Sequence, residues 1–142
     1  MKESIYPCLW FDGKSHEAAD YYCSIFPDSR ILNKTPMVCV FELGGRKMMH
    51  LNGGPEFTFN ESISFVISCE SQEEIDYYWS ALTSNGREGK CGWLTDKYGV
   101  SWQVVPSILG GLMSDPEKAP KVMYAFMQMK KFDIQKLMDS AL

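Results

Sequence analysis

Apolar and polar positions follow a pattern that occurs twice along the chain. Short apolar runs at residues 8–11 and 63–67 have the length and composition of strands, and each precedes apolar residues at helical spacing. Both helical segments share the frame Ser-x-Glu-x-x-Asp-Tyr-Tyr, which begins at Ser15 and again 56 residues later at Ser71. A match at a fixed offset indicates a duplicated structural unit.

Both serines are suited to begin a helix. Ser15 and Ser71 are each expected to act as an N-cap, and Glu74 completes a capping box with Ser71. The predicted helices cover residues 16–26 and 72–84. These features indicate a fold and carry no chemistry of their own.

Three strands are expected after each helix. In the first copy they are residues 30–34 and the hairpin formed by 37–43 and 46–51, whose Gly-Gly connection suits a tight turn. In the second copy a loop at 86–92 precedes a short strand at 93–94 and a strand at 100–105. The order strand, helix and three strands therefore occurs twice.

The last third of the sequence is different. Apolar residues at helical spacing predict a helix over residues 115–129 and a shorter helix after Asp133, with a methionine-rich face for core or subunit packing. The chain of 142 residues is long enough for one domain. We predict a single α+β domain with module one at about 1–56, module two at about 57–107 and a helical C-terminal tail at about 108–142.

Composition narrows the class of protein. A net charge of −4 and a hydrophobic content of 45% are typical of a soluble globular protein, and they predict no nucleic-acid partner. No apolar run approaches the roughly 18 residues that span a membrane, and no signal peptide is apparent. Five cysteines without a Cys-x-x-Cys pair favour free thiols and a cytoplasmic location.

Several stretches of sequence resemble a known family. They are residues 7–13 (PCLWFDG), 51–57 (LNGGPEF), 71–79 (SQEEIDYYW), 91–106 (CGWLTDKYGVSWQVVP) and 127–133 (MQMKKFD). Together they resemble the PhnB-like branch of the vicinal-oxygen-chelate superfamily, which holds glyoxalase I, bleomycin-resistance proteins and dioxygenases. This branch often carries a 3-demethylubiquinone-9 3-methyltransferase label.

The resemblance implies a fold and an assembly. The two βαβββ modules would form a glyoxalase/bleomycin-resistance/dioxygenase-type sheet cup around a small-molecule site, in a homodimer. The methyltransferase label is not expected to describe the activity, because the sequence has no Gly-x-Gly-x-x-Gly after a strand to hold a nucleotide-like cofactor.

The resemblance also implies where a metal would bind, with one ligand on the first and one on the last strand of each module. The corresponding places are Tyr6 or Pro7, the neighbourhood of His50, Ile63 or Ser64, and Gln103. Only His50 and Gln103 are usable donors, which is too few for a divalent ion such as Zn, Ni, Mn or Fe. We therefore expect no cofactor, with such a metal as the alternative.

The candidate ligand-binding residues combine polar and aromatic side chains. They are His50, Gln103, Trp102, Trp10, Tyr6 and Phe57. The aromatic members suit a small-molecule pocket but also suit a core. His50 would orient a ligand or transfer a proton if its strand face lines the cup, and would otherwise be a solvated or core-edge histidine.

Three functions remain open from the sequence. The first is a binding protein that holds a small, partly aromatic molecule in a metal-free cup. The second is a metal-dependent lyase, isomerase or dioxygenase acting on a substrate with vicinal oxygens. The third is a structural or regulatory dimer with no ligand site. We expect the first, and the sequence identifies no catalytic residue.

Overall fold

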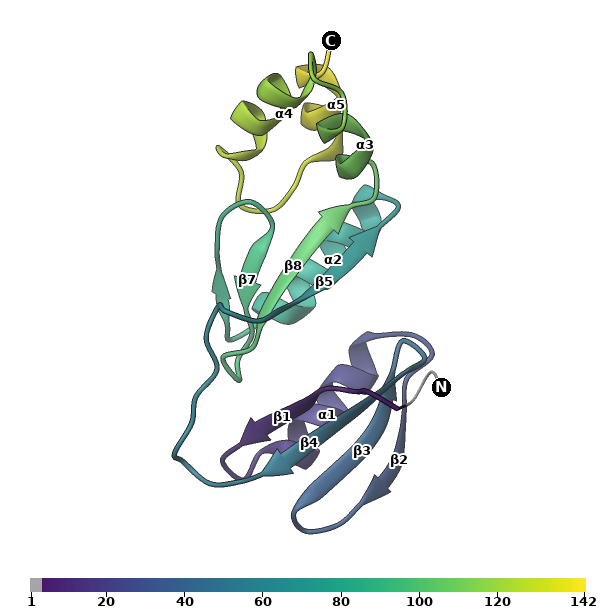
Figure 1. The fold of residues 1–142 in the computed structure, drawn as a ribbon, viewed down its shortest axis with the longest axis vertical. Coiled ribbons are helices and arrows are strands. Elements are labelled where there is room, and N and C mark those ends of the chain that lie inside the picture. Colours follow the sequence, from purple (N-terminus) through teal and green to yellow (C-terminus); the bar gives the residue numbers. More distant parts are fainter. Residues whose placement is uncertain (1–3) are drawn as a thin grey trace. The chain divides into compact units, whose positions relative to one another are not determined.

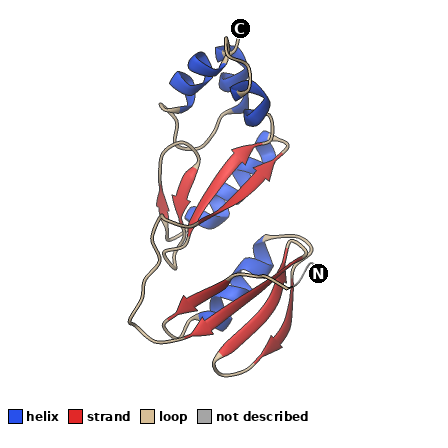
Figure 2. Cartoon of the chain, in the orientation of Figure 1, coloured by secondary structure: helices blue, strands red, loops and turns tan. Residues whose placement is uncertain are grey.

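The computed structural model describes residues 4–142 and divides into two compact units, with the boundary between Thr58 and Phe59. The element order confirms the duplicated pattern, because a strand, a helix and three strands occur in each unit (Figure 1). The C-terminal helices follow the second set (Figure 2).

The first unit is a four-stranded mixed sheet with one helix. Its elements are β1 (Cys8–Phe11), α1 (Ser15–Ile25), β2 (Arg30–Lys34), β3 (Val38–Leu43) and β4 (Arg46–Asn52). The strand order is β1-β4-β3-β2, with β1 parallel to β4 and the other pairs antiparallel. Gly44 and Gly45 have φ angles of 57° and 81°, which confirms the predicted tight turn between β3 and β4.

The second unit repeats this topology. Its elements are β5 (Ser64–Cys69), α2 (Gln72–Thr83), β6 (Arg87–Glu88), β7 (Trp93–Thr95) and β8 (Ser101–Pro106), in the order β5-β8-β7-β6. The segment 86–92, expected to be only a loop, contains β6. Arg87 and Glu88 pair with Thr95 and Leu94, but two charged residues give no apolar strand pattern in the sequence.

The C-terminal segment forms three short helices. They are α3 (Leu109–Met113), α4 (Ala119–Phe126) and α5 (Ile134–Ser140). The predicted helix over 115–129 is thus shorter than expected, and α3 was not predicted because it contains two glycines. Val122, Phe132 and Leu137 supply the buried side chains here. Met123 and Met127 are exposed within the chain.

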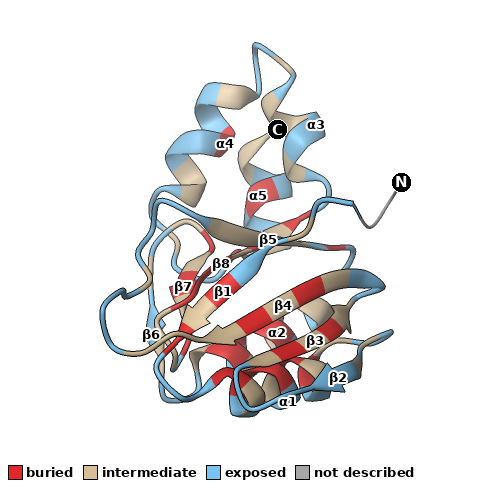
Figure 3. Ribbon diagram, turned by 60° about the horizontal axis from the view of Figure 1, so that its bottom comes forward, coloured by how far each residue is buried: buried red, intermediate tan, exposed pale blue. Residues whose placement is uncertain are grey.

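The hydrophobic core of each unit lies between its helix and its sheet. Buried residues alternate with more exposed ones along β3, β4 and β8, as expected of strands with one covered face (Figure 3). Residues 4–142 contain no helix that is both long and apolar enough to cross a membrane.

Candidate ligand-binding site

Each sheet has one face packed against the helix of its own unit and one opposite face, which we call the open face. In the first unit the helix-facing side includes Phe11, Phe41 and Met48, all buried. Because side chains alternate along a strand, Trp10 and Met49 belong to the open face. This division determines which predicted residues can reach a ligand.

His50 lies on the helix-facing side of the first sheet. Its side chain is fully buried, and Nδ1 lies 3.1 Å from the carbonyl oxygen of Ser15. The rings of Phe11, Phe41 and Tyr22 surround it at centroid distances of 4.4, 4.6 and 5.6 Å. Burial lowers the pKa of His50 to about 4, so the ring is neutral near pH 7. This placement in the core corrects the prediction that His50 lines a cup.

Trp102 likewise lies on the buried, helix-facing side of the second sheet. Its side chain is 2% exposed, and its ring packs against Phe65 at a centroid distance of 5.2 Å. The indole Nε1 donates a 2.9 Å hydrogen bond to Oδ2 of the buried Asp96. Asp96 Oδ1 also accepts from the amides of Tyr98 and Val100, which fixes the turn before β8. Trp102 is therefore a core residue and not part of the open face, which differs from the place in a ligand pocket that was expected for it.

The strand register explains why these two residues correspond. Leu9 pairs with His50, and Phe65 pairs with Trp102. Leu9 and Phe65 are 56 residues apart, the offset of the duplicated frame. His50 is therefore the counterpart of Trp102, and the next residue, Leu51, is the counterpart of Gln103.

The same register tests whether a metal ion would fit at the places implied by the family resemblance. On the last strands those places hold the apolar Leu51 and the amide of Gln103, whereas divalent ions prefer imidazole, carboxylate or thiolate ligands. Within residues 4–142 no group of three or more His, Cys, Asp or Glu side chains could hold a metal ion. The residues present do not fit a catalytic metal.

Trp10 and Phe57 are brought together in the first unit. Their rings meet edge to face at a centroid distance of 5.0 Å, and Phe57 remains 63% exposed. Trp10 Nε1 donates a 2.8 Å hydrogen bond to the carbonyl oxygen of Gly54. A Cβ at Gly53 would lie 2.4 Å from the Trp10 ring, so only glycine allows this close approach. Tyr6 has a separate partner, Lys47, whose Nζ lies 4.2 Å from the ring centroid.

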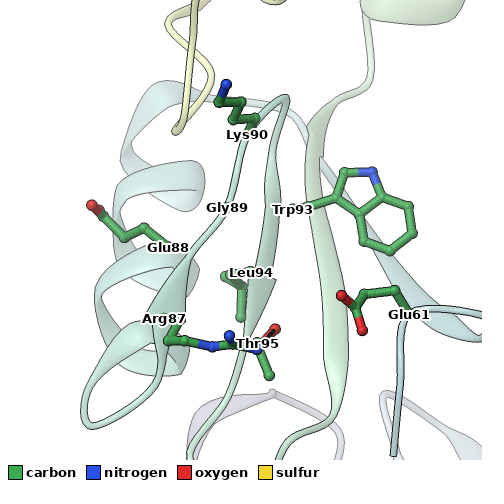
Figure 4. Close-up of a pocket in the computed structure, with 8 residues that line it drawn as sticks. All are labelled: Glu61, Arg87, Glu88, Gly89, Lys90, Trp93, Leu94 and Thr95. Carbon is green, nitrogen blue, oxygen red and sulfur yellow. Dashed lines mark hydrogen bonds between the residues drawn. The ribbon is translucent and has the colours of Figure 1, made fainter.

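Gln103 lies on the open face of the second sheet. Its Nε2 donates a 2.9 Å hydrogen bond to Ser64 Oγ on β5, and its cross-strand partner on β7 is Trp93. A groove of about 410 Å³ lies next to this pair. The residues lining it are Glu61, Arg87, Glu88, Gly89, Lys90, Trp93, Leu94 and Thr95 (Figure 4).

Most of this groove could not be predicted from the sequence. Trp93 is expected there only as part of a short strand, and Arg87 lies in a segment expected to be a loop. Pairing places Arg87 opposite Thr95, and Thr95 shares a strand face with Trp93. The signal that could have found the groove is the alternation Trp93-Leu94-Thr95, in which only the middle residue is buried.

A second hollow, of about 670 Å³, lies between the start of α2 and residues 128–136. Its lining is mostly polar, and two of its charges are already paired, since Lys131 Nζ lies 2.8 Å from Asp76 Oδ1. The groove beside Trp93 is the better candidate for a partly apolar ligand because it offers an aromatic side chain.

The buried thiols do not suit nucleophilic catalysis. Burial, reinforced by Glu74 and Glu70, raises the pKa of Cys69 to about 11. Burial also raises the pKa of Cys39 and of Cys23. These three groups are therefore protonated thiols near pH 7, whereas the thiolate is the nucleophile.

Two tandem βαβββ units, each with one helix on its sheet, define the class of protein. The fold is that of the vicinal-oxygen-chelate superfamily. A fosfomycin-resistance protein, FosX, from Listeria monocytogenes has this fold, with a TM-score of 0.61 and 10% identity over 80% of this chain and 97% of that chain. A Pseudomonas aeruginosa protein also has a TM-score of 0.61, with 20% identity over 72% and 96% of the two chains.

The family is narrower than the fold. The sequence profile of the 3-demethylubiquinone-9 3-methyltransferase family matches residues 3–105, and the chain belongs to that family. A PhnB protein from Bacillus cereus with the same methyltransferase name is 31% identical over 72% of this chain and 98% of that chain, with a TM-score of 0.67. The search of curated proteins finds no match.

Proposed function

We propose that this protein binds a small, partly aromatic molecule without a metal ion, using the open face of its second sheet. The observation that carries the proposal is the groove of about 410 Å³ beside the partly exposed indole of Trp93. Ligand sites commonly combine apolar or aromatic walls with a few placed polar groups. Trp93 supplies the aromatic wall. Gln103, which is oriented by Ser64 and lies directly across from Trp93, supplies a polar group.

For the first unit taken by itself, we propose a separate ligand-binding role for Trp10, Tyr6 and Phe57. Its support is the aromatic surface where Phe57 is exposed and meets Trp10 edge to face. His50 and Trp102 would act only indirectly, each by fixing the strands of its own sheet. We further propose a cytoplasmic location, supported by the five free cysteines, and no nucleic-acid partner, supported by the net charge of −4. The homodimer that we also propose rests on the family resemblance alone.

A metal-dependent lyase, isomerase or dioxygenase is the second candidate. One observation favours it, namely the fold shared with FosX, which was crystallised with Mn(II) and sulfate. The donor set argues for the metal-free alternative, because Leu51 occupies the place equivalent to Gln103. Methyl transfer is not our proposal, since the sequence has no Gly-x-Gly-x-x-Gly to receive a nucleotide-like cofactor.

Two measurements on the purified chain test this proposal. After expression with zinc, nickel, manganese and iron, elemental analysis should find less than a stoichiometric amount of any metal. One equivalent of a single metal per chain would favour the enzyme. In calorimetry, S-adenosylmethionine should bind no more tightly than methionine, which has the same amino-acid end, and much tighter binding would support the family's name.

Ligand binding is tested by tryptophan fluorescence with a panel of small aromatic compounds. We expect a bound compound to change the emission of the wild type and to lose affinity in Trp93→Phe. Tyr124→Phe is the matched control, because Tyr124 is an exposed aromatic residue on α4 outside the groove. Equal affinity in the wild type and Trp93→Phe would remove the groove from the site.

A further inference from the structure

The groove beside Trp93 carries opposite charges at separate places. Lys90 also lines it, but Figure 4 shows the Lys90 side chain directed away from Arg87 and Glu61. Glu61 belongs to the segment before β5, whereas Arg87 belongs to β6 on the edge of the sheet. Among residues 4–142, neither side chain takes part in a salt bridge. Figure 4 shows the Glu61 carboxylate next to the Trp93 indole, while the Glu88 carboxylate points away from both. The Glu88 carboxylate accepts a 2.6 Å hydrogen bond from Trp79 Nε1, so we do not count it among the groups that bind a ligand.

The Arg87 end of the groove offers hydrogen-bond donors to an oxyanion. The guanidinium of Arg87 lies beside Thr95, with Nη2 and Oγ1 3.5 Å apart, at the outer limit of a hydrogen bond. Cross-strand pairing continues this row from Thr95 to Ser101 on β8 and Ser64 on β5. The hydroxyl of Ser101 is buried and has no hydrogen-bond partner in the described chain. A guanidinium beside hydroxyls suits a carboxylate, phosphate or similar group.

The Glu61 end of the groove suits the opposite charge. A carboxylate beside an indole attracts a protonated amine in two ways, through Coulomb attraction and through the negative face of the ring. A purely anionic ligand would meet repulsion from Glu61, and a purely cationic ligand would meet repulsion from Arg87. A ligand with both charges satisfies both ends.

We propose that the groove binds a small zwitterion. Its oxyanion contacts Arg87 and Thr95, its ammonium group contacts Glu61, and its apolar body lies against Trp93. The volume of about 410 Å³ accommodates a molecule of amino-acid or dipeptide size. This assignment rests on the proposed function, and it narrows the ligand from a partly aromatic molecule to one with two opposite charges.

Three probes with the same phenyl body separate the charges. They are phenylalanine, 3-phenylpropionate, which lacks the amine, and 2-phenylethylamine, which lacks the carboxylate. Binding to the full chain is measured by ligand-observed NMR titration at low salt. We expect phenylalanine to bind about tenfold more tightly than either single-charge probe, which corresponds to one charged contact. Equal affinities for all three probes would overturn the zwitterion assignment.

Charge-removing variants show which end recognises which group. Arg87→Gln should weaken the binding of phenylalanine and 3-phenylpropionate about tenfold and should not weaken the binding of 2-phenylethylamine, which the Arg87 charge repels. Glu61→Gln should weaken the binding of phenylalanine and 2-phenylethylamine about tenfold and should not weaken the binding of 3-phenylpropionate, which the Glu61 charge repels. Arg46→Gln and Glu117→Gln are matched controls, because both residues are exposed and outside the groove. If either variant no longer bound any of the three probes but kept its thermal unfolding midpoint, the assignment would also be overturned.

The outcome separates this inference from the proposed function. Trp93→Phe could lower the affinity of all three probes while the two charge variants leave every affinity unchanged. The groove would then bind ligands without recognising their charges, and only the zwitterion assignment would be wrong. If Trp93→Phe leaves every affinity unchanged, the groove is not the site, and the proposed function fails with it.

Discussion

At the residue scale, the burial of His50 has a consequence for stability. One ring nitrogen faces the Ser15 carbonyl, and the other, Nε2, is buried and has no hydrogen-bond partner among residues 4–142. A proton on Nε2 would place a charge among three aromatic rings, where no acceptor compensates the lost hydration. The folded state therefore resists protonation, and the unfolded chain does not.

The folded chain should accordingly lose stability as the pH falls below the ordinary histidine value. The pKa of His50 is lowered from 6.5 to about 4, so the unfolded state binds one more proton between these values. The free energy of unfolding then rises with pH in this window, and the total contribution is roughly 3 kcal/mol. Urea titrations of the wild type and His50→Phe at pH 7, 6, 5 and 4 measure it.

The comparison removes the contribution of the carboxyl groups, which titrate in both proteins. We expect the pH dependence of His50→Phe to be flatter by the stated amount. The same substitution at His16, which lies outside the core, is the control and should keep the wild-type dependence. Parallel curves for the wild type and His50→Phe would mean that His50 does not resist protonation.

The site residues show what the sequence could and could not predict at this scale. Alternation along a strand follows from the sequence, but which face is covered does not. Gln103 and Trp10 lie on open faces, whereas His50 and Trp102 lie in the cores, because their faces depend on register. The helices and first strands repeat at an offset of 56, but the register matches His50 with Trp102, only 52 residues later. The four-residue difference arises in the strands between them, where the sequence sets no register.

At the element scale, the two helices begin differently despite their shared frame. Ser71 is the N-cap of α2, and its hydroxyl accepts from the amide of Glu74 at 3.2 Å. Ser15 is already inside α1, where its hydroxyl is buried without a partner. The amide of Ser15 instead donates to Asn52 Oδ1 at the end of β4, at 2.9 Å. The predicted N-cap is therefore confirmed for Ser71 and wrong for Ser15.

Replacing each serine by alanine should separate these roles. Ser71→Ala removes a cap and should lower the free energy of unfolding by about 1 kcal/mol. Ser15→Ala removes only an unpartnered hydroxyl and should be close to neutral. Urea denaturation measures both, and each variant is the control for the other. If both variants lost the same free energy of unfolding, Ser15 would have to cap its helix in solution.

Much of the fold followed from local sequence signals. The start of α2, the Gly44-Gly45 turn and the left-handed Asn85 after α2, with φ of 61°, have short-range causes. α3 was missed because of its two glycines, and β6 was missed because tertiary pairing, and not local preference, determines it. Glu88 shows this, since its side chain bonds to Trp79 on α2 and its backbone pairs with Leu94.

At the scale of the whole molecule, the C-terminal segment is held to the rest of the second unit by contacts between residues that are distant in sequence. Gln72 Nε2 donates to the carbonyl oxygen of Phe132 at 3.0 Å, and its Oε1 accepts from the amide of Ile134 at 2.9 Å. The amides of Cys91 and Gly92 donate to residues 129 and 130. A Cβ at Gly92 would lie 2.4 Å from the Phe132 ring, so the loop before β7 packs closely on the tail. The tail therefore supports the same loop that leads into Trp93.

Removing the Gln72 amide should loosen the tail without unfolding α2. Gln72→Ala deletes both hydrogen bonds to the tail, which should cost roughly 1–3 kcal/mol and speed amide exchange across residues 129–137. Gln135→Ala is the matched control, because Gln135 is exposed and bonds only within α5, to Asp139. Hydrogen exchange measured by mass spectrometry distinguishes the two. If residues 129–137 exchange equally slowly in both variants, the apolar contacts of Phe132 and Leu137 hold the tail by themselves, and the Gln72 bridge contributes nothing.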